Sequence, residues 1–242
     1  MNEFSKFKMS DMIELGSKLR RLGQGAKSLE ETAQRIVHSL FDSLILGTAP
    51  GEKAFTLVRF FKTHSYGNLP AELQKSASGI LGNHPASPEM KCLTLLATVG
   101  ENPAWNSRKD STGHKAIPLP SEKIVVQFPM ISQLVNQFGL KVSEILKPTP
   151  DLIMELEQKA YNVFHVPTAL GSPFIPAQDN FVVPYKVKSV LGFGGMFPSG
   201  DLFAIIMFGK VPVSHESAEL FKTLALSVKM AVLPFINGVI FS

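Results

Sequence analysis

Apolar residues recur at helical spacing near both ends of the chain. Residues 28–46 keep apolar side chains at positions i, i+3, i+4 and i+7 over three turns, which is typical of an amphipathic helix. Ser28, with Glu31 three residues later, predicts a capping box at its start. A second stripe of this kind covers 214–233, where Ser214 is the expected N-cap. Periodicity and capping together therefore predict two long helices.

Another helix is expected before these two, over residues 10–22. Ser10 is its candidate N-cap, and Gly23 is its candidate stop. Shorter helices are expected within 67–88, within 121–139 with a proline-forced boundary at Pro129, and over 151–160.

Between the helices the pattern changes to short apolar runs bounded by turn residues, which predict β-strands. The run "LFAIIMFG" has no polar alternation, which is typical of a central strand covered on both faces. The sequence "PSGD" at 198–201 predicts a hairpin turn just before it. The expected strands are 53–63, 90–100, 161–166, 186–197 and 202–213.

The order of these elements favours an α+β fold, in which an antiparallel sheet carries helices on one face. The first and last long helices are expected to lie side by side beneath the sheet. We interpret residues 1–27 as an N-terminal helical extension and 28–242 as one domain with an enlarged middle insertion at about 101–160.

Composition and charge narrow the function classes. The formal charge of +4 comes from scattered Lys and Arg, apart from the short run 18–21, so no nucleic-acid surface is expected. The single cysteine, Cys92, excludes an intramolecular disulfide and any site that needs several cysteines. The sequence has no signal-peptide core and no apolar stretch of about 18–20 residues. We therefore expect a cytoplasmic protein that does not insert into a membrane.

Several of these segments resemble a GAF domain. The similarity is carried by "ETAQRIVHSLFDSL" as the opening helix, by "AFTLVRFFKTH" and "MKCLTLLATVG" as the first strands, and by "VKSVLGFGGMFPSGDLFAIIMFGKVPVSHESAELFKTLALSVKMAV" as the closing strands and helix. It spans roughly 28–236 and rests on apolar periodicity and turn glycines. The wider sequence is similar to the N-terminal sensory regions of bacterial histidine kinases and diguanylate cyclases.

This resemblance implies a GAF/PAS-like architecture, with terminal helices on one face of the sheet and loops and short helices over the other. It implies a small-molecule or chromophore pocket on that second face. It also implies a signal passed through dimer-forming terminal helices to a downstream kinase or cyclase. Because no kinase or cyclase catalytic motif is present in the sequence, we expect a sensor without catalytic activity of its own.

The segment 161–178 is expected to border the pocket. If 161–166 is a strand, Tyr161 and His165 share one face, and the sequence leaves open which face lines the pocket. His165 has three open roles: a ligand contact, an axial ligand to haem iron or another metal, or a histidine bonded to neighbouring backbone. Gln178, in the loop that follows, is a further candidate ligand contact.

The polar segment 101–122 holds a second group of candidates. Trp105 offers a stacking surface, Arg108 a fork-shaped cation that clamps a carboxylate or phosphate, and His114 a titratable ring. The open alternative is a solvated loop whose tryptophan packs as a lid on the core.

Other features favour ordinary structural roles. Cys92 lies within an expected strand, so a thioether-linked bilin is not expected, and the GAF-type free methionine sulfoxide reductases need more than one cysteine. The glycines of "GFGG" (192–195) precede a turn and a strand, which indicates a bulge or close backbone approach and not a nucleotide loop. The six histidines have no metal-type spacing, and no cofactor is identified.

The apolar segment "LPFINGVIF" at 233–241 predicts an interface, and a homodimer is its commonest form.

The resemblance and the candidate residues together give the function hypothesis, a GAF-like domain that senses a small molecule in bacterial signal transduction. A protein-interaction or dimerisation module whose pocket is filled by its own side chains is the alternative. A haem- or chromophore-binding sensor and an enzyme with an unfamiliar site are the other readings left open.

Overall fold

A six-stranded antiparallel sheet forms the centre of the molecule, with its strands in the order β5-β4-β3-β8-β7-β6. This computed structural model describes residues 2–47, 52–111, 114–158 and 161–242. The strands of the sheet are β3 (Phe55–Ser65), β4 (Lys91–Gly100), β5 (Ala116–Leu119), β6 (Phe164–Val166), β7 (Ser189–Met196) and β8 (Leu202–Gly209). Two short strands, β1 (Asn2–Glu3) and β2 (Leu44–Ile45), pair in parallel outside it.

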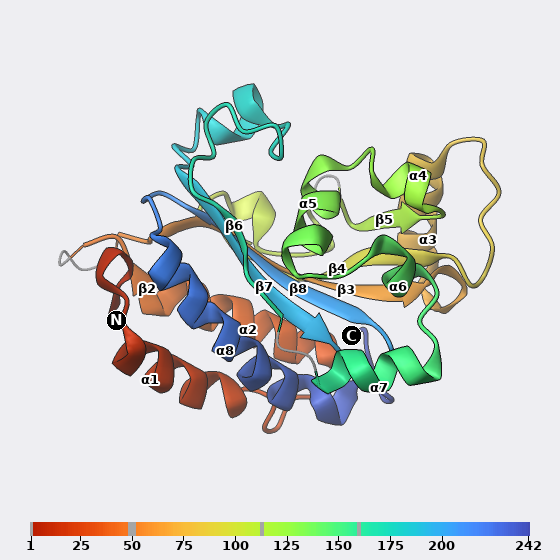
Figure 1. Cartoon of the computed structure of the whole chain (residues 1–242), viewed down its shortest axis with the longest axis horizontal. Coiled ribbons are helices and arrows are strands. Elements are labelled where there is room, and N and C mark those ends of the chain that lie inside the picture. Colours follow the sequence, from red (N-terminus) through yellow and green to blue (C-terminus); the bar gives the residue numbers. More distant parts are fainter. Residues whose placement is uncertain (1, 48–51, 112–113, 159–160) are drawn as a thin grey trace.

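Three long helices cover one face of the sheet, which we call the inner face (Figure 1). They are α1 (Met9–Arg20), α2 (Leu29–Ser43) and α8 (His215–Val232). Helices α1 and α8 lie side by side beneath the sheet, and α8 also contacts α2, the first of the two long helices that the sequence predicted. Apolar side chains from all three helices form one cluster with the inward side chains of the central strands. Burial of this apolar stripe is the main force that holds the helices on the sheet.

Short helices and loops cover the opposite face, which we call the outer face (Figure 1). The short helices are α4 (Glu122–Val125), α5 (Pro129–Gln137) and α6 (Val142–Leu146). Helix α3 (Ala71–Leu81) packs against β4 and the edge strand β5, and α7 (Pro150–Gln158) lies near the β7–β8 hairpin. This arrangement, with the sheet covered on both faces, confirms the predicted α+β, GAF/PAS-like fold class.

Local signals explain where most of these elements begin. Ser28 Oγ accepts a hydrogen bond from Glu31 N at 3.0 Å, and Ser214 Oγ accepts one from Ser217 N at 3.1 Å, so both predicted caps are confirmed. The Glu31 carboxylate accepts from Lys27 N, one residue outside the box that the sequence predicted. Pro129 is the first residue of α5, where its missing N–H costs nothing, and this confirms the predicted boundary.

Three sequence predictions about these elements were wrong. Ser10 is not an N-cap, because α1 begins at Met9 and its cap residue is Lys8. The strand expected over 161–166 begins only at Phe164. No strand was expected within 101–122, but Ala116–Leu119 pairs with β4 as the edge strand β5. Edge pairing depends on partners that lie far away in sequence, so local patterns locate it poorly.

The glycines of β7 confirm the predicted close backbone approach. A Cβ added to Gly194 would lie 2.1 Å from the Phe203 carbonyl oxygen, and one added to Gly192 would lie 2.7 Å from Ile206 Cδ1. The predicted hairpin turn joins β7 to β8, with Gly200 at a φ of 75°. Strand β8 is buried at every residue and lies between β3 and β7, which confirms its predicted central position.

Candidate functional site

The outer face is apolar along most of the sheet, and Arg59 of β3 is the exception near its centre. In register, Arg59 lies opposite Thr98 on β4 and Ile206 on β8. Residues paired across antiparallel strands point to the same face. Ile206 belongs to the outer apolar cluster, so the Arg59 side chain points to the outer face as well.

No carboxylate pairs with Arg59 among the residues that the structure describes. Its Nη2 donates to Ser111 Oγ at 3.2 Å, and its buried Nε has no partner in the described part of the chain. Burial lowers the pKa of the Arg59 guanidinium to about 10, because removal of water disfavours the charged form. The opposite Thr98 is fully buried, and its Oγ1 also lacks a partner within the described ranges. Two buried polar atoms without partners among the described residues, Arg59 Nε and Thr98 Oγ1, therefore lie on neighbouring strands near the middle of the sheet.

The segment that covers this group is the β4–β5 loop, residues 101–115. Ser111 is 1% exposed and supplies the hydroxyl that Arg59 contacts. His114 has a φ of 56°, an uncommon value for a side chain of its size. As a residue it remains exposed, but partial loss of water and the positive charge of Arg59 lower the pKa of its imidazole. His114 is thus close enough to Arg59 for their charges to interact.

Trp105, predicted as a ligand contact, packs on the protein itself. A Cβ added to Gly100 would lie 2.8 Å from Trp105 Cε3, so the indole rests on the end of β4. Its ring centroid is 4.6 Å from Tyr185 and 5.6 Å from Phe181. This packing agrees with the alternative prediction, in which the tryptophan of the loop packs as a lid on the core. Trp105 is only partly buried as a residue.

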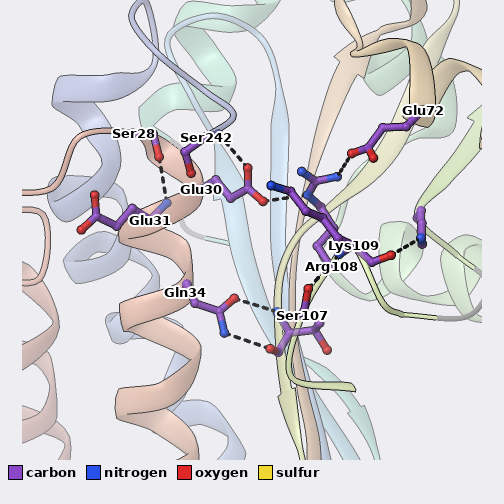
Figure 2. Close-up of polar contacts among 11 residues, drawn as sticks. Ser28, Glu30, Glu31, Gln34, Glu72, Ser107, Arg108, Lys109 and Ser242 are labelled. Atoms are coloured by element: carbon purple, nitrogen blue, oxygen red, sulfur yellow. Dashed lines mark hydrogen bonds and ion pairs between the residues drawn. The ribbon is translucent and has the colours of Figure 1, made fainter. Parts of the chain in front are cut away.

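Arg108 is held by carboxylates of the chain itself (Figure 2). Its Nε donates to Glu30 Oε1 at 2.8 Å, and its Nη1 donates to Glu72 Oε1 at 2.6 Å. Its side chain is 3% exposed, and its guanidinium carbon lies 5.5 Å from the ring centroid of Phe241. These interactions join the β4–β5 loop to the first turns of α2 and α3. In this state the guanidinium that was predicted to clamp a ligand is already occupied.

The last residues of the chain meet the same cluster. We call residues 239–242 the tail segment. Val239 and Ile240 carbonyl oxygens accept from Leu29 N and Glu30 N at 3.0 and 2.8 Å, so they satisfy open N–H groups at the start of α2. Ser242 N donates to Glu30 Oε2 at 2.9 Å (Figure 2). The apolar side chains that predicted an exposed interface thus fold back on the chain, although Val239 is 59% exposed.

Tyr161 and His165 do not share a face, contrary to the sequence prediction. Tyr161 precedes the strand and lies in the outer cluster, near Gly195. His165 has its ring centroid 6.4 Å from that of His215, at the start of the inner-face helix α8. Desolvation lowers the pKa of His165, and a hydrogen bond with the Val213 backbone opposes this shift. The Nε2 atom of His165 has no partner among the described residues. Burial raises the pKa of the Tyr161 hydroxyl.

Next to His165 an open groove of about 300 Å³ runs along residues 165–174. Gln178 lies beyond it and bonds to backbone groups: it donates to the Ala169 and Ile175 carbonyl oxygens and accepts from Gly171 N at 2.9 Å. The amide of Gln178 therefore folds the loop after β6 and is fully used there. The six predicted residues thus separate into a group within the β4–β5 loop and a group around β6.

The part of the outer face beneath α4, α5 and α6 is filled by side chains. The cavity there has a volume of about 10 Å³ and is lined by apolar residues with Thr63 at its edge. A cavity of this size is about one water molecule in extent, so it holds no organic ligand in this state.

Two other groups with reactive chemistry, the Cys92 thiol and the His64 imidazole, are buried in their uncharged forms. Desolvation raises the pKa of the Cys92 thiol to about 12, so little of the reactive thiolate is present near neutral pH. Burial, together with the charge of Lys62, lowers the pKa of His64 to about 3.

No cluster of three metal-ligating side chains occurs in the described part of the chain. The helices within those residues include none that is long and apolar enough to cross a membrane.

Comparisons with known proteins give similarity of structure only. No protein-family model and no curated protein matches the sequence. Among solved structures, the GAF domain of a phosphoenolpyruvate-protein phosphotransferase from Acinetobacter aligns at 12% identity with a TM-score of 0.44. The N-acylhomoserine lactone-dependent LuxR-family transcription factor CepR2 from Burkholderia cenocepacia aligns at 12% identity with a TM-score of 0.40. Both alignments cover 94% of this chain and 95% of the other. At this level neither match carries a functional conclusion.

Proposed function

We propose that the chain is a GAF-like sensory or regulatory domain that binds a small molecule on the outer face of its sheet and has no catalytic activity of its own. One observation carries this proposal. The β4–β5 loop contacts Arg59, which pairs with no carboxylate of the described residues, through Ser111, and through Arg108 it contacts α2, α3 and the tail segment. A ligand that changes the position of this loop would therefore change contacts at the ends of the inner-face helices.

The same contacts give the proposal a mechanism. A ligand shifts a population only if it binds one arrangement of the protein more tightly than another. Here the two arrangements differ in whether the β4–β5 loop stays bonded to Glu30 and, through it, to the tail segment. We propose that the output passes through the terminal helices to a second copy of the chain and to a downstream kinase or cyclase in the bacterial cytoplasm.

The first test is whether the purified protein holds or accepts a small molecule. Native mass spectrometry should show retained mass, or a panel of metabolites should raise the melting temperature. A ligand at a hundred times its Kd stabilises the folded state by about 2.7 kcal/mol, which corresponds to a shift of about 5–10 °C for a chain of this size. If no mass is retained and no compound in the panel raises the melting temperature, the ligand-sensing proposal fails.

A second candidate function is a protein-interaction or dimerisation module with a self-filled pocket. It is favoured by the filled region beneath α4, α5 and α6, where the cavity volume is only about 10 Å³. Light scattering of the purified chain separates the two candidates. A dimer that forms without any small molecule, together with a flat thermal-shift panel, would support the interaction module.

A further inference from the structure

We propose that Arg59, with Thr98, Ser111 and His114 around it, binds the carboxylate group of a small organic acid. This inference rests on the ligand-sensing function proposed above and specifies the chemical class of the ligand. Nothing in the sequence resemblance pointed to Arg59.

The first step of the argument is charge. Arg59 is half-buried as a residue, and its Nε is fully buried and has no partner among the described residues. Lys62 and Arg108, which are at least as well buried, are both paired with carboxylates of the chain. A buried charge without a counter-charge is costly, and proteins usually pair it. An anion supplied from outside would remove that cost.

The second step is hydrogen bonding. Thr98 lies opposite Arg59 in the β3–β4 register, and its Oγ1 is buried without a partner in the described part of the chain. Ser111 Oγ is already 3.2 Å from Arg59 Nη2. One guanidinium and two hydroxyls are all donors that a carboxylate accepts from, and the arginine fork fits its two oxygens.

The third step is the size of the charge. Arg59 supplies one positive charge, and the lowered pKa of His114 favours the neutral form of that imidazole. A single positive charge balances a monoanionic carboxylate better than a doubly charged phosphate. Once a carboxylate is bound, the repulsion by Arg59 is neutralised, and the pKa of His114 should rise.

The test uses the full chain and acetate as the probe, with acetamide as its neutral analogue and inorganic phosphate as the competing anion. The Arg59 Nε–H and His114 ring signals are followed by NMR during each titration. We expect acetate to shift both signals saturably and to raise the pKa of His114, and we expect acetamide to do neither. This comparison needs no variant, so it does not depend on the folding of one.

Variants then assign the effect to this residue. Arg59→Met should weaken acetate binding at least tenfold, and Arg59→Lys should weaken it less because the charge remains without the fork. Arg35→Met is the matched control, since Arg35 is paired with Glu31 on α2 and should leave the acetate response unchanged.

Several outcomes would overturn the inference. Equal shifts with acetate and acetamide would show that charge is not recognised, and a response to phosphate without one to acetate would exclude the carboxylate assignment. Retention of a neutral molecule by a protein that ignores acetate would also overturn it, while leaving the ligand-sensing proposal intact. Failure of every small molecule would instead remove the proposed function itself.

Discussion

Arg59 lies on β3 and contacts the β4–β5 loop, whereas Arg108 lies within that loop, and the two side chains differ in whether the chain supplies a counter-charge. Arg108 has two carboxylates and an aromatic ring within reach, and it links three separate segments of the chain. Arg59 has one hydroxyl, and within the described residues no carboxylate pairs with it. A compensated arginine stabilises the fold, whereas an uncompensated one leaves binding capacity unused. The comparison separates a structural cation from a candidate binding cation that the residue type alone would not distinguish.

The largest effect is expected when Arg108 is replaced by Met. The change leaves Glu30, whose side chain is 13% exposed, without its cation. Removing one partner of a buried pair should lower the free energy of unfolding by about 3 kcal/mol, measured by urea unfolding. Glu72→Gln is the matched control and should cost less than about 1 kcal/mol, because the Glu72 side chain is 53% exposed. A loss for Arg108→Met as small as that of Glu72→Gln would contradict the structural role of Arg108.

The next effect concerns acid stability on the Arg108 side of the molecule. His64 packs on Phe241 with ring centroids 5.3 Å apart, and its folded-state pKa of about 3 lies below its ordinary value of 6.5. The unfolded chain therefore takes up the proton first, and the stability that neutral His64 contributes is lost as pH falls below 6.5. From pH 6.5 to 4.5 this loss amounts to about 2 kcal/mol.

His64→Leu isolates that contribution. Over the same pH interval the variant should lose about 2 kcal/mol less than the parent chain, because the carboxylates and other histidines titrate equally in both. Urea unfolding at a series of pH values measures the difference. Identical pH profiles would mean that His64 is not buried as the structure has it.

A smaller loss is expected from Phe241→Ala in the tail segment. The ring contacts both Arg108 and His64, and its removal should cost about 1–2 kcal/mol through lost packing and a lost cation–π contact. Exchange of the Leu29 and Glu30 amides, which the tail segment covers, should become faster. Val239→Ala is the control, since that side chain is 59% exposed and should change neither quantity. Unchanged exchange in Phe241→Ala would show that the ring does not hold the tail segment.

Most of the fold could be predicted from the sequence, because its signals are local. Ser28 and Ser214 cap helices through contacts three residues away, and "LFAIIMFG" shows its burial in its own composition. The helical and strand periodicities are also local signals, so they predicted which segments form the helices and which form the sheet. Tyr161 was misplaced because a strand end depends on pairing with β7, which begins nearly thirty residues later.

The candidate site was less predictable because its partners are distant. Arg108 has polar loop neighbours, which favoured a free ligand clamp, but its carboxylates are 78 and 36 residues away. No local pattern reports such ion pairs. Arg59 did leave a signal: it is a charged residue in the middle of the apolar run "FTLVRFF". Its meaning emerges only when the structure shows which face the side chain takes and that, among the described residues, no carboxylate joins it there.

The smallest expected effect, and the sharpest for the comparison, comes from Arg59→Met in buffer free of small organic acids. Methionine keeps much of the arginine stem and removes an uncompensated charge, so the free energy of unfolding should stay within about 1 kcal/mol of the parent value or rise. Urea unfolding measured beside Arg108→Met would then give a difference of about 3 kcal/mol between the arginine within the loop and the arginine on β3 that the loop contacts. Addition of acetate should stabilise the parent chain and leave Arg59→Met unchanged. A large loss of stability in Arg59→Met without any ligand would place Arg59 beside Arg108 as a structural cation and end the distinction between them.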